Sequence, residues 1–282
     1  MKISLPIALL ALALCAPSHL VRAANQTAAA PSDAQAELAA VVGKIHAKAQ
    51  TGQKTEAAFA DELKELDALL AKHQGEQTDD VAQILLAKAS LYYDLFGDTS
   101  KCVTLINQLK ADFPETAPGK QADSILKTIA RLEDAKKIQA SLVVGAAFPG
   151  FAEADLAGRP LSLDACKGKV VLVDFWATWC PPCVAELPNV LAAYRTYHDR
   201  GFVIIGISLD KDQNALTAFI KDHDMSWPQY FDGKGWENKL ATQYGIQSIP
   251  ATFLLDGKGR IVAKDLRGPA LETELAKLLA KK

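Results

Sequence analysis

Apolar residues in the first half of the chain recur at the spacing of an α-helix. Leu38, Val41 and Ile45 lie three or four positions apart, and similar spacing continues to Leu132. Such spacing places apolar side chains along one face of each helix, where they can pack together. The pattern predicts an all-helical domain over residues 35–139.

Part of this region resembles tetratricopeptide helical pairs. The similarity runs from Val81 to Leu132 and rests on Tyr92, Phe96 and Phe113-Pro114. An array of such repeats needs about three copies to be stable. One or two weak copies therefore favour a small helical bundle, with a peptide-binding repeat array as the alternative.

The pattern changes after residue 140, where short apolar runs alternate with helical segments. Alternating strands and helices indicate an α/β sheet with helices on both faces, and a tight turn at 256–259 predicts an antiparallel strand pair at one edge. The expected strands are 151–153, 161–163, 170–176, 202–208, 251–255 and 260–264, and the expected helices are about 182–198, 213–222, 236–244 and 271–280.

The first 23 residues have the pattern of a secretory signal. Lys2 supplies a positive start, an apolar stretch runs from Leu5 to Ala16, and Val21-Arg22-Ala23 resembles a cleavage site. The stretch is shorter than the ~20 residues that span a bilayer, which favours a cleaved signal over the alternative, an uncleaved membrane anchor. Residues 24–34 are expected to form a flexible leader, and the mature protein is expected in the periplasm or another extracytoplasmic compartment.

Composition and charge narrow the choice of partners. The chain has 282 residues, of which 49% are apolar and 23% charged, and its formal net charge is −2. This length fits two domains of ordinary size. A nearly neutral chain lacks the basic surface that nucleic acid or an anionic membrane attracts, and we expect no nucleic-acid partner.

Export changes how the cysteines are interpreted, because disulfides persist in oxidising compartments. Four cysteines follow the predicted cleavage site: Cys102, Cys166, Cys180 and Cys183. Cys102 and Cys166 are isolated, and each is interpreted as a small buried apolar residue. A Cys102–Cys166 bridge between the two domains is the alternative hypothesis.

Cys180 and Cys183 form a C-x-x-C pair where a predicted strand ends and a helix begins. A disulfide requires the two Cα atoms within about 7 Å, and the N-terminus of a helix stabilises a thiolate. We assign Cys180, at the exposed corner, as the attacking nucleophile and Cys183 as the shielded resolving thiol. A zinc site would need further ligands at suitable spacing, and an inert structural disulfide would not suit an exposed corner.

The C-terminal half resembles the thioredoxin superfamily, and most of all its exported TlpA/ResA-like branch. The resemblance implies a thioredoxin-like fold, in which helices flank a central mixed sheet, and thiol–disulfide oxidoreductase activity. It covers residues 140–282 and does not extend to residues 24–139. The matching residues are Gly168-Lys169, the strand 170–176, Trp179-Cys-Pro-Pro-Cys183, Glu186, Pro188, Ile249-Pro250 and Asp256-Gly257.

The resemblance also implies which residues contact a partner. Pro250 matches the cis-proline of the superfamily, whose bond to Ile249 presents backbone groups to an extended chain. Trp179 is expected to offer a flat contact surface beside Cys180, and Pro181 belongs to the same partner-facing surface. Trp176 is expected in the core instead.

Two acids complete the expected site. Asp174 matches the buried acid of thioredoxins, whose pKa burial should raise, and it could accept the proton of Cys183. The TlpA/ResA-like branch often has Asn at this position. Glu186 matches an acid that ResA-like proteins keep near the site, although a solvated helix residue is an equal interpretation.

These observations predict an exported thiol–disulfide oxidoreductase that reduces disulfides of partner proteins through Cys180 and Cys183. The resemblance implies a membrane electron donor that restores the dithiol, and the cycle requires no bound cofactor or metal. The alternative is a client-binding helical domain joined to an oxidase or isomerase module. A peroxidase would need a Pro-x-x-x-Thr-x-x-Cys signature, which is missing around Cys180.

Overall fold

The computed structural model describes residues 32–280, and the predicted signal and most of the predicted leader lie outside them. The chain divides into two compact units, Met1–Ala130 and Arg131–Lys282. Each unit contains its own apolar core. The division falls inside helix α6 (Ala117–Ser141), whereas the sequence placed the domain boundary at residues 139–140.

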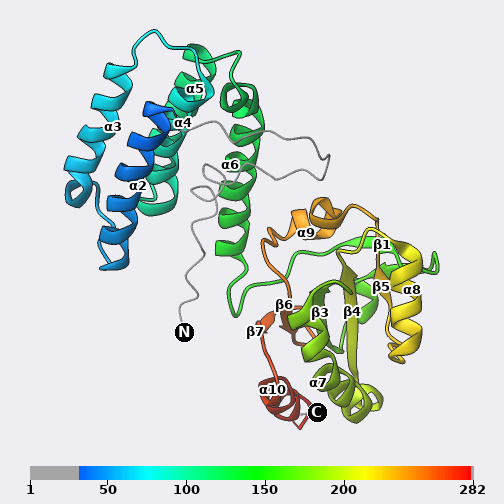
Figure 1. The fold of residues 1–282 in the computed structure, drawn as a ribbon. Coiled ribbons are helices and arrows are strands. Elements are labelled where there is room, and N and C mark those ends of the chain that lie inside the picture. Colours follow the sequence, from blue (N-terminus) through cyan, green and yellow to red (C-terminus); the bar gives the residue numbers. More distant parts are fainter. Residues whose placement is uncertain (1–31, 281–282) are drawn as a thin grey trace. The chain divides into compact units, whose positions relative to one another are not determined.

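The first unit is helical, in agreement with the apolar spacing (Figure 1). The first helix of the described residues begins at Asp33, inside the predicted leader, because the Ser32 hydroxyl accepts a hydrogen bond from the Gln35 N–H and caps the helix. Besides α6, the helical segments are α2 (Asp33–Gln50), η1 (Glu56–Phe59), α3 (Ala60–Lys72), α4 (Asp79–Ser90), η2 (Leu91–Leu95) and α5 (Thr99–Asp112).

The second unit is built on a five-stranded sheet in the order β5-β4-β3-β6-β7. Strand β3 is parallel to β4 and antiparallel to β6, which makes the sheet mixed. The strands are β3 (Val170–Trp176), β4 (Phe202–Ser208), β5 (Gln229–Tyr230), β6 (Ala251–Leu255) and β7 (Ile261–Lys264), and a separate hairpin pairs β1 (Ala152–Ala154) with β2 (Pro160–Ser162).

Strand β3 is buried at every position because both of its faces are covered. Successive side chains of a strand point to opposite faces. The Phe175 ring contacts Tyr244 on one face, whereas Asp174 lies beside residues of two helices on the other. These helices, α7 (Pro181–Tyr197) and α10 (Pro269–Leu279), pack against each other (Figure 1).

Most predicted elements of this unit agree with the structure. The strands 170–176 and 202–208 and the helix α8 (Gln213–Asp222) have the predicted bounds. The helix expected at 236–244 is instead split into η5 (Gly235–Glu237) and α9 (Lys239–Gln243). The split occurs because the Asn238 side chain caps the second segment by accepting a hydrogen bond from Ala241.

The end of helix α6 belongs to the second unit through direct contacts. The Gln139 side chain donates to the Tyr244 carbonyl at 2.7 Å and accepts from the Lys264 ammonium at 3.0 Å. A Cβ atom at Gly245 would lie 2.7 Å from the Ala135 carbonyl oxygen, so only glycine allows this close approach. The unit therefore includes a helical segment that the sequence assigned to the first domain.

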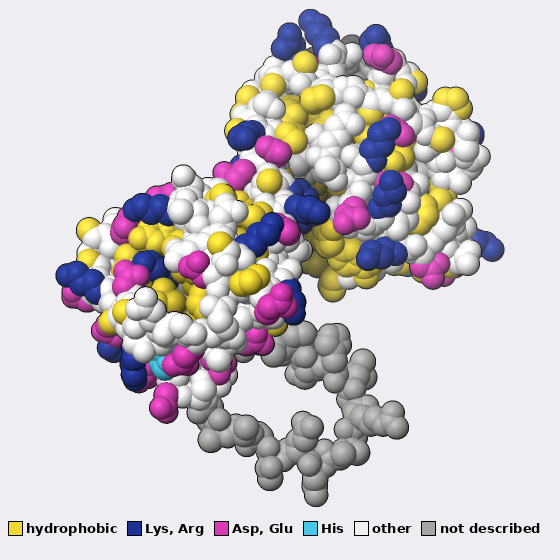
Figure 2. All heavy atoms as spheres, turned by 90° about the horizontal axis from the view of Figure 1, so that it is seen from above, with side chains coloured by type: hydrophobic (Ala, Val, Ile, Leu, Met, Phe, Trp, Pro, Cys, Tyr) yellow, Lys and Arg dark blue, Asp and Glu magenta, His cyan; other side chains and the backbone are white. Residues whose placement is uncertain are grey.

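Charge on the surface is mixed in sign. On the face seen in Figure 2, basic and acidic side chains are interspersed, as the net charge of −2 suggests. Within residues 32–280, no helix has both the length and the apolar content needed to cross a membrane.

Candidate active site

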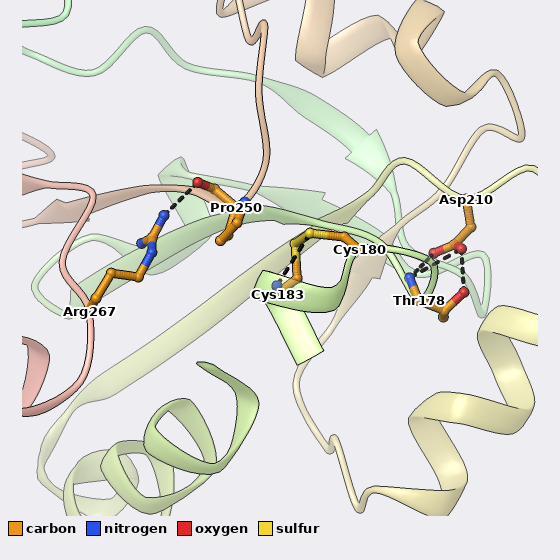
Figure 3. The surroundings of a disulfide bond; sticks show 6 residues. All are labelled: Thr178, Cys180, Cys183, Asp210, Pro250 and Arg267. Atoms are coloured by element: carbon orange, nitrogen blue, oxygen red, sulfur yellow. Dashed lines mark hydrogen bonds between the residues drawn. A yellow bond between two sulfur atoms is a disulfide. The ribbon is translucent and has the colours of Figure 1, made fainter. Parts of the chain in front are cut away.

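Cys180 and Cys183 are joined in a disulfide at the start of helix α7 (Figure 3). The S–S distance is 2.05 Å and the two Cα atoms are 5.3 Å apart. Cys180 is the N-cap residue, and its Sγ accepts a hydrogen bond from the Cys183 N–H at 3.3 Å. Pro181 occupies the first helical position, where its missing N–H leaves no partner unsatisfied.

The disulfide is less exposed than the sequence predicted. Cys180 is 3% exposed and Cys183 is 7% exposed, and both belong to the apolar core of the unit. The prediction of an exposed first cysteine is therefore wrong for this state. Trp179, directly before the pair, is 50% exposed. Its ring lies 6.1 Å from that of Trp236, which is 41% exposed, so two tryptophans form an exposed aromatic surface beside the disulfide.

Asp174 lies in the middle of strand β3, paired in register with Gly206 on one side and Thr252 on the other. It is 9% exposed and lines a small cavity together with Cys183. The cavity leaves about 20 Å³ for the centres of water molecules, which is room for about one water. Burial raises the pKa of Asp174 to about 7, although the positive charge of Arg267 lowers it and the negative charge of Glu186 adds to the rise.

Glu186 is not a solvated helix residue. Its Oε1 accepts a hydrogen bond from the Gly268 N–H at 2.7 Å, across 82 positions of sequence. It also lines the cavity that contains Asp174. The carboxylate therefore joins helix α7 to the segment that precedes helix α10.

The Ile249–Pro250 peptide bond is cis, and both residues are half-buried. The Pro250 carbonyl accepts a hydrogen bond from the Arg267 guanidinium (Figure 3). Sequence reasoning missed Arg267 altogether, because a single arginine in a segment between a strand and a helix carries no motif.

A second residue that the sequence did not reveal is Asp210, directly after strand β4. Its carboxylate accepts hydrogen bonds from the Thr178 N–H at 3.1 and 3.2 Å, from the Thr178 hydroxyl at 2.6 Å and from the Ser208 hydroxyl at 2.7 Å. The loop between β3 and Cys180 is thus anchored to the end of the neighbouring strand. The available signal was the position of the acid, because the carboxyl ends of adjacent parallel strands meet at one edge of a sheet.

The structure also locates Trp176 and the two isolated cysteines, Cys102 and Cys166. Trp176 is in the core, where its Nε1–H donates to the Gln229 side chain at 2.9 Å. Cys102 is buried, as predicted, whereas Cys166 is only half-buried, and both are free thiols. Burial raises the pKa of Cys102 to about 11 and also raises that of Cys166. In the described part of the chain, no group of three or more His, Cys, Asp or Glu side chains is arranged to hold a metal ion.

Comparison with known proteins places the second unit among redox proteins. Residues 144–264 match the AhpC/TSA family. The chain is 33% identical to the thiol-disulfide oxidoreductase ResA of Bacillus thuringiensis subsp. konkukian over 138 residues. These residues make up 49% of this chain and 78% of the relative. The thioredoxin-like protein YneN of Bacillus subtilis is 34% identical over 128 residues, which are 44% of this chain and 72% of the relative.

Solved structures with similar sequences carry related names. The thioredoxin domain of a thiol-disulfide oxidoreductase from Bacteroides vulgatus is 36% identical, covers 49% of this chain and 99% of its own, and superposes with a TM-score of 0.46. A putative thiol:disulfide interchange protein DsbE from Chlorobium tepidum is 29% identical, with a TM-score of 0.44 over 49% of this chain and 99% of its own.

The mixed sheet, the disulfide at the start of a helix and these curated relatives define a thioredoxin-like enzyme that exchanges thiols and disulfides. In its C-terminal half, the chain belongs to the ResA family of thiol-disulfide oxidoreductases.

Proposed function

We propose that this protein reduces disulfides of partner proteins outside the cytoplasm, by cycling Cys180 and Cys183 between dithiol and disulfide. The observation that carries the proposal is the shared cavity of Cys183 and Asp174. It places an acid with a pKa near neutrality beside the inner thiol, where the chemistry of exchange requires a proton acceptor.

In the first step, the Cys180 thiolate attacks a disulfide of the partner. A bond forms between Cys180 Sγ and one partner sulfur, the partner disulfide breaks, and the second partner sulfur leaves as a thiolate that takes a proton from solvent. The Cys183 N–H, which already donates to Cys180 Sγ in the disulfide, is placed to stabilise this thiolate, as is the N-terminus of helix α7.

In the second step, Asp174 accepts the proton of the Cys183 thiol. The Cys183 thiolate then attacks Cys180 Sγ, and the bond to the partner breaks. The partner sulfur leaves with the bonding electrons and is protonated, so two electrons have passed to the partner. An Asp174 carboxyl with a pKa of about 7 is partly ionised at neutral pH and can both accept and release this proton.

The surface that receives the partner is proposed to surround the disulfide. Trp179 and Pro181, next to Cys180 in the chain, are exposed, and Ile249 and Pro250 are half-buried. An extended partner chain can contact the backbone of Ile249 while its apolar side chains rest on the Trp179 ring.

The reducing direction and the extracytoplasmic location rest on the family resemblance and on the signal pattern of residues 1–23. A membrane electron donor is proposed to supply the two electrons that restore the dithiol. A redox titration against glutathione tests the direction. A potential near the strongly reducing end of the range for such proteins, about −270 mV, supports a reductase, and one near about −120 mV would instead indicate an oxidase.

The assignment of the two cysteines is tested by insulin reduction driven by dithiothreitol. Cys180→Ser is expected to abolish the activity, and Cys183→Ser is expected to accumulate mixed disulfides with insulin because the captured chain cannot be released. Cys166→Ser removes a free thiol outside the site and serves as the matched control with full activity. Insulin reduction by Cys180→Ser at the normal rate would reject the assignment.

A further inference from the structure

Arg267 extends from the segment between strand β7 and helix α10 toward the active site. Its guanidinium donates to the Pro250 carbonyl, to the Thr252 hydroxyl at 3.2 Å and to the Leu266 carbonyl at 2.7 Å. Figure 3 shows the guanidinium directed at Pro250, on the side of the disulfide opposite Asp210. The planar fork of an arginine suits such simultaneous hydrogen bonding, which a lysine cannot reproduce.

The next residue joins the same segment to the cysteine helix. The Gly268 N–H donates to Glu186 on helix α7 at 2.7 Å. Gly268 has a φ of +53°, a conformation that other residues rarely adopt. Arg267 and Gly268 therefore tie two parts of the site together, the strand that follows Pro250 and the helix that carries Cys183.

The guanidinium also acts on Asp174 through its charge. Three ionisable side chains line the cavity, Asp174, Glu186 and Arg267, together with Cys183, which becomes ionisable when the disulfide is reduced. Asp265, in the same segment as Arg267, accepts a hydrogen bond from the Thr252 N–H. Burial raises the pKa of Asp174, the Arg267 charge lowers it, and the Glu186 charge raises it. The cavity has room for only about one water molecule, and charges are screened less in such a site than in bulk water.

We infer that Arg267 is a positioning residue of the thiol–disulfide exchange, which holds the Pro250 carbonyl in place and keeps a positive charge beside Asp174. The inference rests on the proposed function, in which Asp174 accepts the Cys183 proton. Only an ionised carboxylate can accept that proton. By favouring the ionised form, Arg267 extends the second step to lower pH.

The test follows the second step directly in the full chain. The reduced protein, carrying Cys166→Ser to remove the half-buried free thiol, is mixed with one equivalent of the neutral disulfide dithiodipyridine, which releases one thiopyridone when Cys180 attacks and a second when Cys183 resolves the mixed disulfide. The rate of the second release is measured as a function of pH. In the wild type it should rise as Asp174 ionises.

Arg267→Gln is expected to move the midpoint of this rise to higher pH and to slow the second release severalfold to about tenfold below neutrality, since one pKa unit corresponds to a factor of ten. Arg267→Met, which retains the aliphatic stem, should give the same shift. Arg267→Lys keeps the charge and should hold the midpoint near that of the wild type. Lysine cannot form the simultaneous hydrogen bonds of the guanidinium, so Pro250 should be held less firmly and the rate of insulin reduction should fall.

Two further variants separate charge from packing. Glu186→Gln removes the negative charge and should move the midpoint in the opposite direction, to lower pH. Arg260→Gln is the matched control, because this arginine donates to the Gly145 carbonyl and does not line the cavity. A midpoint that stays in place or moves to lower pH in both Arg267→Gln and Arg267→Met would overturn the inference.

Failure of the proposed function gives a different result. If Cys183→Ser still released the second thiopyridone, Cys183 would not be the resolving thiol, and this result is independent of Arg267. If instead the wild type showed the expected rise and the Arg267 variants showed the same rise at the same midpoint, the proposed function would stand and the role of Arg267 would be rejected.

Discussion

Two buried aspartates belong to neighbouring strand segments of the same sheet, Asp174 within strand β3 and Asp210 just after strand β4, and their surroundings differ. Asp174, in strand β3, faces a small cavity and the charges of Arg267 and Glu186, and burial raises its pKa to about 7. Asp210, after strand β4, is 3% exposed, and three donors from Thr178 and Ser208 bind its carboxylate.

This difference shows that burial alone does not define the role of an acid. The hydrogen bonds that Asp210 accepts make it an anchor, whereas burial raises the pKa of Asp174 and so prepares this carboxylate to take a proton. We interpret Asp210 as the residue that places the loop before Cys180 and Asp174 as the one that exchanges a proton with Cys183.

The largest expected effect comes from removing the proton acceptor. Asp174→Asn keeps the shape of the side chain but cannot accept a proton, and general base catalysis contributes about 10²–10⁴-fold. The release of the second thiopyridone should therefore slow about 100-fold or more at neutral pH, and its rise with pH should disappear. A second release that keeps the wild-type pH profile in stopped-flow measurements would show that another group accepts the proton.

The same substitution should change how stability depends on pH. Folding raises the pKa of Asp174 from 3.8 to about 7, so between these values the folded state holds a proton that the unfolded state has released. The contribution of Asp174 to the free energy of unfolding is fully present below about pH 4 and is lost as the pH rises through about 7. At 1.36 kcal/mol for each pKa unit, the loss amounts to about 4 kcal/mol.

Urea denaturation of the oxidised protein over this pH range checks the expectation. The free energy of unfolding of Asp174→Asn, relative to the wild type, should increase by about 4 kcal/mol from about pH 4 to above pH 7. Parallel curves for the two proteins would mean that Asp174 is ionised as readily in the folded state as in the unfolded state.

Removing the Asp210 carboxylate should mainly lower the stability of the protein. Asp210→Ala leaves the Thr178 N–H and two hydroxyl groups without their acceptor, and a buried unsatisfied donor costs about 1–3 kcal/mol. We expect a loss of about 3 kcal/mol in thermal or urea unfolding, with slower attack by Cys180 because the preceding loop is less well placed.

The neighbouring Asp212 offers a matched comparison. It is exposed and caps helix α8 through the N–H groups of Asn214 and Ala215. Asp212→Ala should cost about 1 kcal/mol without slowing Cys180. Equal losses in the two variants would argue against a special role for Asp210.

The smallest effect is expected at the exposed aromatic surface. Trp179→Ala should reduce the rate of insulin reduction by a few-fold, consistent with about 0.5–1.5 kcal/mol for an aromatic contact. Reaction with dithiodipyridine, which offers no polypeptide to bind, should change less. An equal loss with both disulfides would place the effect on the cysteine pair itself and not on partner contact.

The sequence by itself predicted the features that local patterns encode. A largely apolar run of seven residues, 170–176, is long enough to identify the central strand. The C-x-x-C pair that follows it identifies the redox chemistry, and the family resemblance pointed to Asp174 and Pro250. Each of these depends on neighbours in the chain or on a motif of few residues, so spacing and residue type were sufficient.

The tertiary structure alone decided the contacts between distant segments. Arg267 reaches Pro250 across 17 positions, Thr178 reaches Asp210 across 32, and Gly268 reaches Glu186 across 82. The burial of Cys180 and the capping of the split helix at Asn238 also depend on how the elements pack. Sequence spacing encodes the period of a helix or strand, but the partners of a side chain across a sheet are set by chain topology, and topology follows from packing of the whole unit.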